Sequence, residues 1–328
     1  MRAAVVGAGP VGRIHARALM NNRDVELVAI CGRTAQKTEA LAGAAGARAY
    51  LSVDDLMKRE HPNLVCVCTG NQDHVDPVLT ALQERAHVFV EKPMAWRVDD
   101  ARHMVKTAEE RDVMLGVNFN HRFSTPFRRA FDWQLSGNLG TLAYVDMKFC
   151  GDLYKDLDDP YCQLIETQGH SFDIMRLVGG EVDEVHAFLA DPRKMGVYTS
   201  AAVTVRFANG AVGTLLGSWD GSYAHPAAQV LEASGTEGRF VVDNVVDSVR
   251  LFRHNEDVYT EWRPGLFDDE ARDFWRTIDA HIDAFVSALG AGRKPPVSGR
   301  DGLKALELTY AAIRSFEEGR SVRPQELS

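Results

Sequence analysis

The sequence has few cysteines and no long apolar run, and each shortage excludes a class of protein. Its 328 residues include five cysteines, most of them inside apolar segments. This pattern is typical of reduced, buried thiols rather than of a disulfide framework. Cys66 and Cys68 lie two residues apart without further ligands at metal-binding spacing nearby, so we expect core thiols and no metal site. No stretch of about 18 apolar residues is present to span a membrane.

The sequence also lacks an excess of positive charge. The net charge is -9 and no run of Lys and Arg forms a basic face, so nucleic acid and anionic membranes are poor partners. The opening "MRAAVVGAGPVG" reaches glycine turns without the apolar core of a signal peptide, and we therefore expect a cytoplasmic protein. Hydrophobic residues make up 45% and charged residues 25%, which indicates a globular protein with a substantial core.

Strand and helix patterns alternate over the first 120 residues. Apolar segments predict parallel strands at 3–7, 25–31, 63–69, 87–91 and 113–117. Amphipathic segments between them predict helices at 12–21, 35–46, 51–60, 73–85 and 98–112. Near-continuous apolar strands separated by helices are typical of a parallel sheet covered on both faces. We therefore predict a doubly wound α/β dinucleotide-binding domain over residues 1–121.

The pattern changes after residue 121. Helices are predicted near 126–137, 166–178, 270–289 and 301–317, and strands at 142–150, 184–190, 201–219, 228–243 and 248–253. The turns "ANGA" and "GTEG" have hairpin chemistry, so this second sheet is expected to be mostly antiparallel. Residues 122–328 are predicted to form a second α/β domain. The polar stretch 151–161 is expected to be a loop.

A glycine motif follows the first predicted strand. Gly7, Gly9 and Gly12, with Pro10 and Val11 between them, form G-x-G-x-x-G at the start of a helix. Such glycines allow a pyrophosphate to approach the backbone N–H groups and the positive dipole of the helix N-terminus. The motif alone is often only a glycine-rich turn, but its strand–turn–helix context favours dinucleotide binding.

The end of the second predicted strand indicates which dinucleotide binds. NAD-binding domains usually carry an acid about 20 residues after the motif, whereas here Gly32 takes that place and Arg33 and Thr34 follow. Without the carboxylate a 2′-phosphate is not repelled, and Arg33 can pair with it. A surface arginine in a turn is the alternative. We favour NADP(H) over NAD(H).

Lys92 stands directly before Pro93 at the end of a predicted strand, in "HVFVEKP". Ligands of open parallel sheets bind at the carboxyl ends of the strands. A lysine there can stabilise an alkoxide or relay the proton of a hydroxyl group that loses hydride. The alternative is a solvated loop lysine.

A second group of polar residues lies in "LIETQGHSFDIMRLVGG". Glu166 and His170 are four residues apart, so on a helix they share a face, and Asp173 follows three residues later. His170 is suited to act as a general base near neutral pH, with a carboxylate to orient its ring. A buried histidine without a chemical role is the alternative.

Together these motifs resemble the Gfo/Idh/MocA oxidoreductase family, which includes inositol and sugar dehydrogenases. The resemblance covers nearly the whole chain. Its motifs are "GAGPVGRIHARAL", "CTGNQDH", "EKP", "NFNHRF", "ETQGHSFDIMRLVGG" and "PVSGRDGLKALELTYAAIRSFEEGR".

The resemblance assigns roles to individual residues. Lys92 matches the family's catalytic lysine, in a Lys–Pro bond that is commonly cis, and His170 matches its helix-borne histidine. Glu166 stands where many members carry Asp, and Gly70 replaces a usual proline. Six residues match family positions that border the cofactor: Thr69, Gly70, Asn71, His74, Glu91 and Asn120.

The implied function is a dehydrogenase or reductase that transfers hydride between nicotinamide and a secondary hydroxyl of a sugar, cyclitol or related polyol. The family's second domain has an open sheet that usually packs against another subunit, so a homodimer or homotetramer is expected. Arg122, Tyr154 and the acidic loop 152–159 are candidates for shaping the substrate pocket. Two alternatives are a lyase or glycosidase that uses bound nicotinamide transiently and a non-catalytic sensor. The presence of Lys92, Glu166 and His170 together argues against a sensor.

Overall fold

The chain folds into two compact units in the computed structural model, which describes residues 1–152 and 159–327. The first unit comprises Met1–Asn120 and Trp275–Leu303, and the second comprises His121–Phe274 and Lys304–Ser328. The predicted extents, 1–121 and 122–328, differ from these because the segment 275–303 returns to the first unit. An amphipathic helix pattern does not specify which core the helix covers, so this return could not be predicted from the pattern.

The first unit is built on a parallel sheet of six strands in the order β3-β2-β1-β4-β5-β6. The strands are β1 (Arg2–Val6), β2 (Glu26–Cys31), β3 (Arg48–Tyr50), β4 (Leu64–Val67), β5 (His87–Val90) and β6 (Leu115–Val117). The doubly wound fold is confirmed. The chain reverses its direction of winding between β1 and β4, and ligands of such sheets bind at this switch point, outside the carboxyl ends of the strands.

Helices connect these strands. They are α1 (Pro10–Asn21), α2 (Ala35–Ala45), α3 (Val53–Glu60), α4 (Val75–Gln83) and α5 (Val98–Arg111). The Ser52 side chain accepts a hydrogen bond from the Asp55 amide and caps α3, as its spacing predicts. Each helix begins near the carboxyl end of a strand, so the helix N-termini lie at the edge of the sheet where a ligand is expected.

Helix α9 (Arg276–Gly290) completes the first unit. Its apolar residues Ile278, Ile282 and Phe285 are buried in one cluster with Leu19 and Phe89. At about 1.5–3 kcal/mol for each large apolar side chain that is buried, this face holds the helix to the first unit although it lies 150 residues further along the chain.

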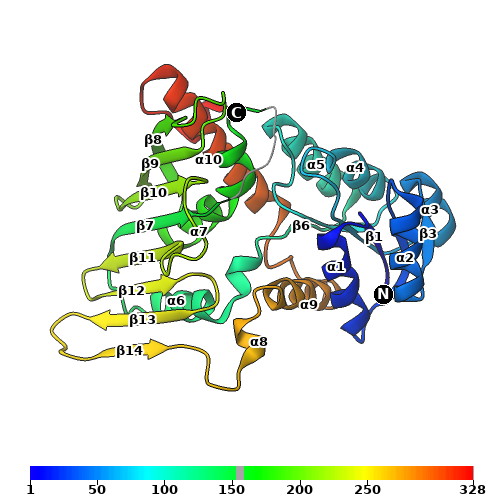
Figure 1. Ribbon diagram of the computed structural model, residues 1–328, viewed down its shortest axis with the longest axis horizontal. Helices are drawn as coiled ribbons and strands as arrows, with labels where there is room; N and C mark the ends of the chain where they lie inside the picture. Colours follow the sequence, from blue (N-terminus) through cyan, green and yellow to red (C-terminus); the bar gives the residue numbers. More distant parts are fainter. Residues whose placement is uncertain (153–158, 328) are drawn as a thin grey trace. The chain divides into compact units, whose positions relative to one another are not determined.

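The second unit contains a sheet of eight strands in the order β14-β13-β12-β11-β7-β10-β9-β8 (Figure 1). They are β7 (Leu142–Cys150), β8 (Val182–Ala190), β9 (Ser200–Phe207), β10 (Val212–Ser218), β11 (Gln229–Gly235), β12 (Gly238–Asp243), β13 (Ser248–Arg253) and β14 (Tyr259–Trp262). All neighbouring pairs are antiparallel except β7 and β10. The prediction of a mostly antiparallel second sheet is therefore confirmed.

Two helices pack against this sheet. Helix α6 (Thr125–Leu135) contacts β12 and β13, and α7 (Gly169–Gly179) contacts β7 and β10. The elements that complete the described chain are the 20-residue helix α10 (Gly299–Glu318) and four short ones, η1 (Asn120–Phe123), η2 (Gln163–Thr167), α8 (Asp269–Arg272) and η3 (Pro324–Leu327). Ser298 and Asp301 exchange hydrogen bonds at the start of α10 and form a capping box.

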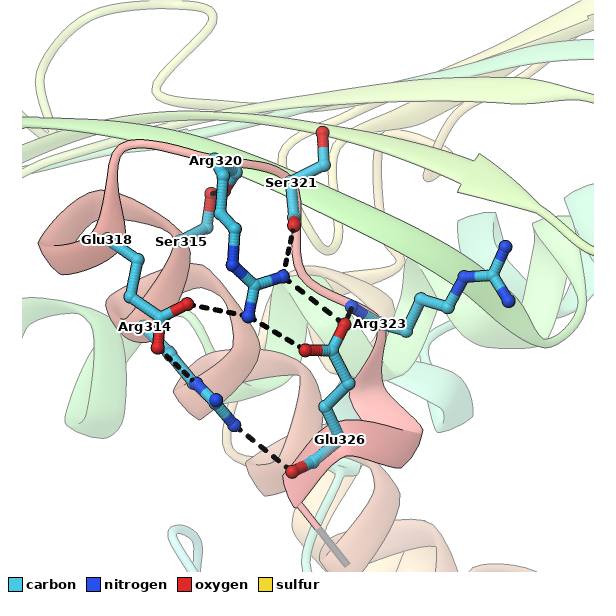
Figure 2. A network of polar contacts seen from close by, with 7 residues as sticks. All are labelled: Arg314, Ser315, Glu318, Arg320, Ser321, Arg323 and Glu326. Atoms are coloured by element: carbon cyan, nitrogen blue, oxygen red, sulfur yellow. Dashed lines mark hydrogen bonds and ion pairs between the residues drawn. The ribbon is translucent and has the colours of Figure 1, made fainter.

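A network of charges holds the C-terminal segment onto α10 (Figure 2). The Arg320 guanidinium contacts the carboxylates of Glu318 at 2.6 Å and Glu326 at 2.8 Å. The Arg323 amide also donates to Glu326, at 2.9 Å. The hydrogen bonds that Arg320 and Arg323 donate to Glu326 lower the pKa of Glu326 to about 2. Its carboxylate therefore stays charged under mildly acidic conditions.

The described residues bear on two expectations from the sequence, that the cysteines are free thiols and that no segment spans a membrane. All five cysteines lie in the described ranges, and each is a free thiol. Burial raises the pKa of Cys31 to about 11 and that of Cys66 still further. Among the helices that the structure describes, none has the length and apolar character needed to cross a bilayer.

Candidate functional site

The glycine motif forms a tight turn between β1 and α1. Gly7 has φ +122, and a Cβ there would lie 2.3 Å from the Cys68 carbonyl oxygen. A Cβ on Gly12 would lie 1.8 Å from the Gly7 carbonyl oxygen. Both positions therefore require glycine for the chain to turn from the strand into the helix at all.

Gly9 differs from its two neighbours. It is the N-terminal cap of α1, has no side-chain cap, and is followed by Pro10 and Val11 in a first turn without an acid. A Cβ on Gly9 would meet no atom within 4 Å. The fold does not require glycine at this position. A bound ligand would require it, because the open space lies beside free N–H groups at the positive end of the helix. A dinucleotide pyrophosphate fits this cradle.

The end of β2 leaves no room for the acid typical of NAD-binding domains. A Cβ on Gly32 would lie 2.6 Å from the Thr38 hydroxyl oxygen and 3.1 Å from the Ala8 Cβ. Thr34 is the N-terminal cap residue of α2, and no side-chain cap bond forms there. The exposed guanidinium of Arg33 lies 3.1 Å from the Asp73 carboxylate. Asp73 was not among the residues predicted to form the site.

The turn after β4 is closed by its own hydrogen bonds. The Thr69 hydroxyl donates to the Asp73 carbonyl at 2.9 Å, and the Asp73 amide donates to the Gly70 carbonyl at 2.8 Å. Asn71 lies partly exposed in the same turn. Because β4 is next to β1, these residues stand at the same sheet edge as the glycine turn.

Lys92 follows β5 at this edge, and its peptide bond to Pro93 is cis, as the resemblance implies. The fully buried His74 holds the segment, since its Nδ1 lies 2.8 Å from the Pro93 carbonyl oxygen and its Nε2 lies 3.3 Å from the Thr69 carbonyl oxygen. Burial lowers the pKa of His74. Its imidazole thus links the turn after β4 to the turn that carries Lys92.

Glu91 takes part in a polar chain inside the first unit. Its carboxylate lies 2.7 Å from His15 Nε2 and accepts a hydrogen bond of 2.6 Å from Asn118, whose own oxygen lies 3.0 Å from His281 Nδ1. Burial alone would raise the pKa of Glu91, but the bonds from His15 and Asn118 and the charge of Lys92 outweigh it and lower that pKa. Glu91 is therefore a carboxylate, and it also accepts a hydrogen bond of 3.3 Å from the Lys92 backbone amide.

Asn120, also predicted to border the cofactor, is buried and donates to the Thr277 hydroxyl at 2.6 Å. This bond joins Asn120 to α9 within the first unit. It could not be predicted from the sequence, because the two residues lie 157 positions apart in the chain.

The second unit carries Glu166 and His170, and both are buried. The predicted helix starting at 166 is not one regular α-helix: Glu166 lies in a π-helical turn, η2, and α7 begins at Gly169. The Trp219 indole donates to Thr167 at 2.9 Å and the Gln168 amide donates to the Phe149 carbonyl at 3.3 Å. π-Helical turns inside helices are frequent at functional sites.

His170 is stacked on His121. The ring centroids are 3.9 Å apart and the planes differ by 8°. His121 is itself buried and lies 3.1 Å, through Nδ1, from the Gln229 amide nitrogen. His121 belongs to the motif "NFNHRF", but this contact could not be predicted from the sequence, because nothing in the local pattern links η1 to α7.

Arg122 and Asp173 form a buried ion pair within the second unit. The Arg122 Nε donates to Asp173 at 2.7 Å, and a second nitrogen contacts the other carboxylate oxygen. Such a forked pair fixes η1 against α7. Arg122 was a candidate for shaping the substrate pocket and is here committed to this pair. Tyr154 and most of the loop 152–159 lie outside the described residues.

No cluster of His, Cys, Asp and Glu with metal-binding geometry occurs in the described part of the chain. The residues suited to chemistry form two groups. The first unit carries the glycine turn and Lys92, and the second carries the stacked His121 and His170 together with the Glu166 carboxyl group.

Comparison with known proteins agrees with this chemistry. The sequence model of the "Oxidoreductase family, NAD-binding Rossmann fold" matches residues 1–119, and that of the "GFO/IDH/MocA C-terminal domain" matches residues 127–241. The chain is 29% identical to myo-inositol 2-dehydrogenase of Thermotoga maritima, over 100% of this chain and 99% of that protein. It is also 29% identical to inositol 2-dehydrogenase of Rhizobium meliloti, over 98% of each chain.

A solved structure of a probable dehydrogenase from Thermotoga maritima shares the fold with a TM-score of 0.86 and 28% identity, covering 100% of both chains. Matches to both domains and along the full length establish the relationship. The chain belongs to the Gfo/Idh/MocA family and is an oxidoreductase that acts on CH–OH groups with NAD(P).

Proposed function

We propose that this protein is an NADP(H)-preferring dehydrogenase of a secondary hydroxyl on a cyclitol, sugar or related polyol. The observation that carries the proposal is Lys92, which is held by His74 and Glu91 at the sheet edge that also presents the glycine cradle. Full-length similarity to two inositol 2-dehydrogenases supports the substrate class.

The cofactor would be held by residues of the first unit. Gly7, Gly9 and Gly12 would take the pyrophosphate, with the first turn of α1, Pro10 and Val11, beneath it. The turn after β4 and the residues that follow β2 would border the adenosine: Arg33, Thr34, Thr69, Gly70 and Asn71. The side chains of His74, Glu91 and Asn120 are engaged in contacts within the protein, so we assign them a supporting role behind that surface.

Bound nicotinamide supplies the hydride acceptor or donor. The residues of this chain then handle the hydroxyl proton. We propose that Lys92 stabilises the alkoxide that forms as the proton leaves, and that His170 accepts this proton and returns it in the reverse reaction. Glu166, three residues before α7 begins, is assigned a supporting electrostatic role.

The cofactor preference rests on Arg33 and Gly32. Arg33 is an exposed cation at the end of β2, and Gly32 leaves no space for a competing acid. Arg33→Ala should weaken NADP+ binding about tenfold or more and leave NAD+ binding within about twofold, since only the 2′-phosphate pairs with the guanidinium. Arg59→Ala removes the same charge in the last turn of α3 and serves as the matched control. Equal losses of both dinucleotides in Arg33→Ala would overturn the preference.

We also propose a homodimer or homotetramer formed through the uncovered face of the second sheet. Phe188, Ala202 and Leu216 are aligned directly across β8, β9 and β10, and Phe188 is 68% exposed. Leu216→Lys should shift the molar mass measured by light scattering towards that of a monomer. A monomeric wild-type protein would refute the assembly.

The free thiols support a reducing compartment, which we propose is the cytoplasm.

The function is tested by following nicotinamide reduction with purified protein and a panel of cyclitols and sugars, with NADP+ and NAD+ in parallel. Reduction with one polyol class, and faster with NADP+ than with NAD+, is expected. Confirmed cofactor binding without reduction of nicotinamide by any polyol would refute the proposed reaction.

A further inference from the structure

Asp73 is the one described side chain in ion-pair contact with the guanidinium on which the proposed NADP preference rests. Its carboxylate oxygen lies 3.1 Å from Arg33 Nη1. The side chains are 85% exposed for Arg33 and 50% exposed for Asp73, so a ligand can reach both. The pair bridges the ends of β2 and β4, across the carboxyl end of β1, where the glycine cradle lies.

The backbone holds Asp73 in this place. Its amide and carbonyl are fixed by Gly70 and by the Thr69 hydroxyl. A Cβ on Gly70 would lie 3.1 Å from the Asp73 carboxylate oxygen, closer than side chains normally pack. The glycine at position 70 therefore gives the carboxylate the space in which it reaches Arg33.

A 2′-phosphate and the Asp73 carboxylate compete for one cation. The phosphate carries about -1.5 to -2 charges at neutral pH, so it must displace the carboxylate from Arg33 and then remain beside it. Like charges at such distances repel each other even in a solvent-exposed site. NAD(H) has no 2′-phosphate and meets no such conflict.

We infer that Asp73 is a specificity-determining residue that lowers the affinity for 2′-phosphorylated dinucleotide by holding Arg33. This inference rests on the proposed binding of the 2′-phosphate by Arg33. It makes Asp73 an internal competitor that weakens the preference for NADP(H) below what Arg33 alone would give, and it leaves NAD(H) binding unaffected.

Calorimetric titration with NADP+ and NAD+ tests this, because it measures binding without turnover. Asp73→Asn should tighten NADP+ binding fivefold or more and change NAD+ binding by less than twofold. In an Arg33→Ala background, Asp73→Asn should change the logarithm of the NADP+ affinity by at most half as much as it does in the wild type, because Asp73 acts largely through Arg33. Asp112→Asn is the matched control, since Asp112 is an exposed acid at the C-terminal end of α5, in a left-handed conformation that Asn also adopts.

Unchanged NADP+ affinity in Asp73→Asn would overturn the inference, and so would a similar gain for both dinucleotides. Weaker NAD+ binding would overturn it as well, because Asp73 would then act as an acceptor for the ribose hydroxyls. The dinucleotide preference of the wild-type protein is a separate result. A wild type that prefers NAD+ would refute the proposed preference, while a gain in NADP+ affinity in Asp73→Asn would still support the role of Asp73.

Discussion

The imidazole rings of His121 and His170 lie face to face, 3.9 Å apart and 8° from parallel. His170 comes from α7, where the resemblance places the family's histidine, whereas His121 comes from η1. The stack therefore gives the proposed base a fixed ring plane, supplied by a residue 49 positions earlier in the chain. Because both rings are buried, neither plane is set by solvent.

Removal of the stacking partner should reduce catalysis more than it affects substrate binding. His121→Ala leaves a cavity beside His170, and we expect kcat to fall about tenfold to a hundredfold with a smaller change in KM, since misplacement of about 1 Å can cost about a hundredfold. His121→Phe keeps a flat aromatic partner and should recover most of kcat, although loss of the Gln229 contact will lower its Tm. Steady-state kinetics on the two variants would contradict this role if Ala and Phe behaved alike.

Opposite results are expected when alanine replaces Gly9, the N-terminal cap of α1, and Gly12, in the first turn of that helix. Gly12→Ala brings a Cβ to 1.8 Å from the Gly7 carbonyl oxygen, so we expect a large loss of thermal stability. Gly9→Ala meets no protein atom within 4 Å and should keep the wild-type Tm but weaken dinucleotide binding about tenfold or more. Thermal melts and calorimetry separate the two effects. Tight cofactor binding in a stable Gly9→Ala variant would show that the cradle is not the pyrophosphate site.

His74 should make the protein less stable in acid. Burial lowers its pKa in the folded state below the value of about 6.5 for the unfolded chain. As the pH falls through 6.5 the unfolded state therefore takes up the proton first, and stability decreases by at most about 1.4 kcal/mol per pH unit. His74→Gln does not titrate and keeps a donor for the Pro93 carbonyl oxygen.

Urea unfolding at pH 7.5 and 5.5 measures this difference. The wild type should lose more stability between the two pH values than His74→Gln does. His87, whose pKa is also lowered mainly by burial, is present in both proteins and so cancels in the comparison. An equal loss in both would show that His74 does not contribute.

Much of the fold follows from local pattern. The buried strands β1, β2, β4 and β5 are short apolar segments, and the caps at Ser52 and Ser298 are visible as spaced side chains. The glycine spacing is also a local pattern, although the contact that requires Gly7 comes from Cys68, the residue after the adjacent strand β4. Strands β3 and β14 were not predicted, because they are short edge strands whose side chains are mostly exposed, so neither forms an apolar segment.

The rest depends on contacts between distant segments. The amphipathic pattern of α9 does not reveal that Ile282 and Phe285 pack near Phe89, so its return to the first unit could not be predicted. The pairs Arg33–Asp73, Arg122–Asp173 and His121–His170 each join residues at least 40 positions apart. The sequence patterns pointed to Arg33 and His170, and to both Arg122 and Asp173, but only the folded chain shows which residues interact.

The most direct test of the account is the turnover of Lys92→Met with the polyol found in the screen, measured on the same preparation as its cofactor affinity. Methionine keeps the apolar length of the side chain and removes the ammonium. We predict that kcat falls by about a hundredfold to ten-thousandfold while the Kd for NADP+ stays within about threefold, and that Lys58→Met, on the surface of α3, leaves both unchanged. Wild-type turnover in Lys92→Met would contradict the account.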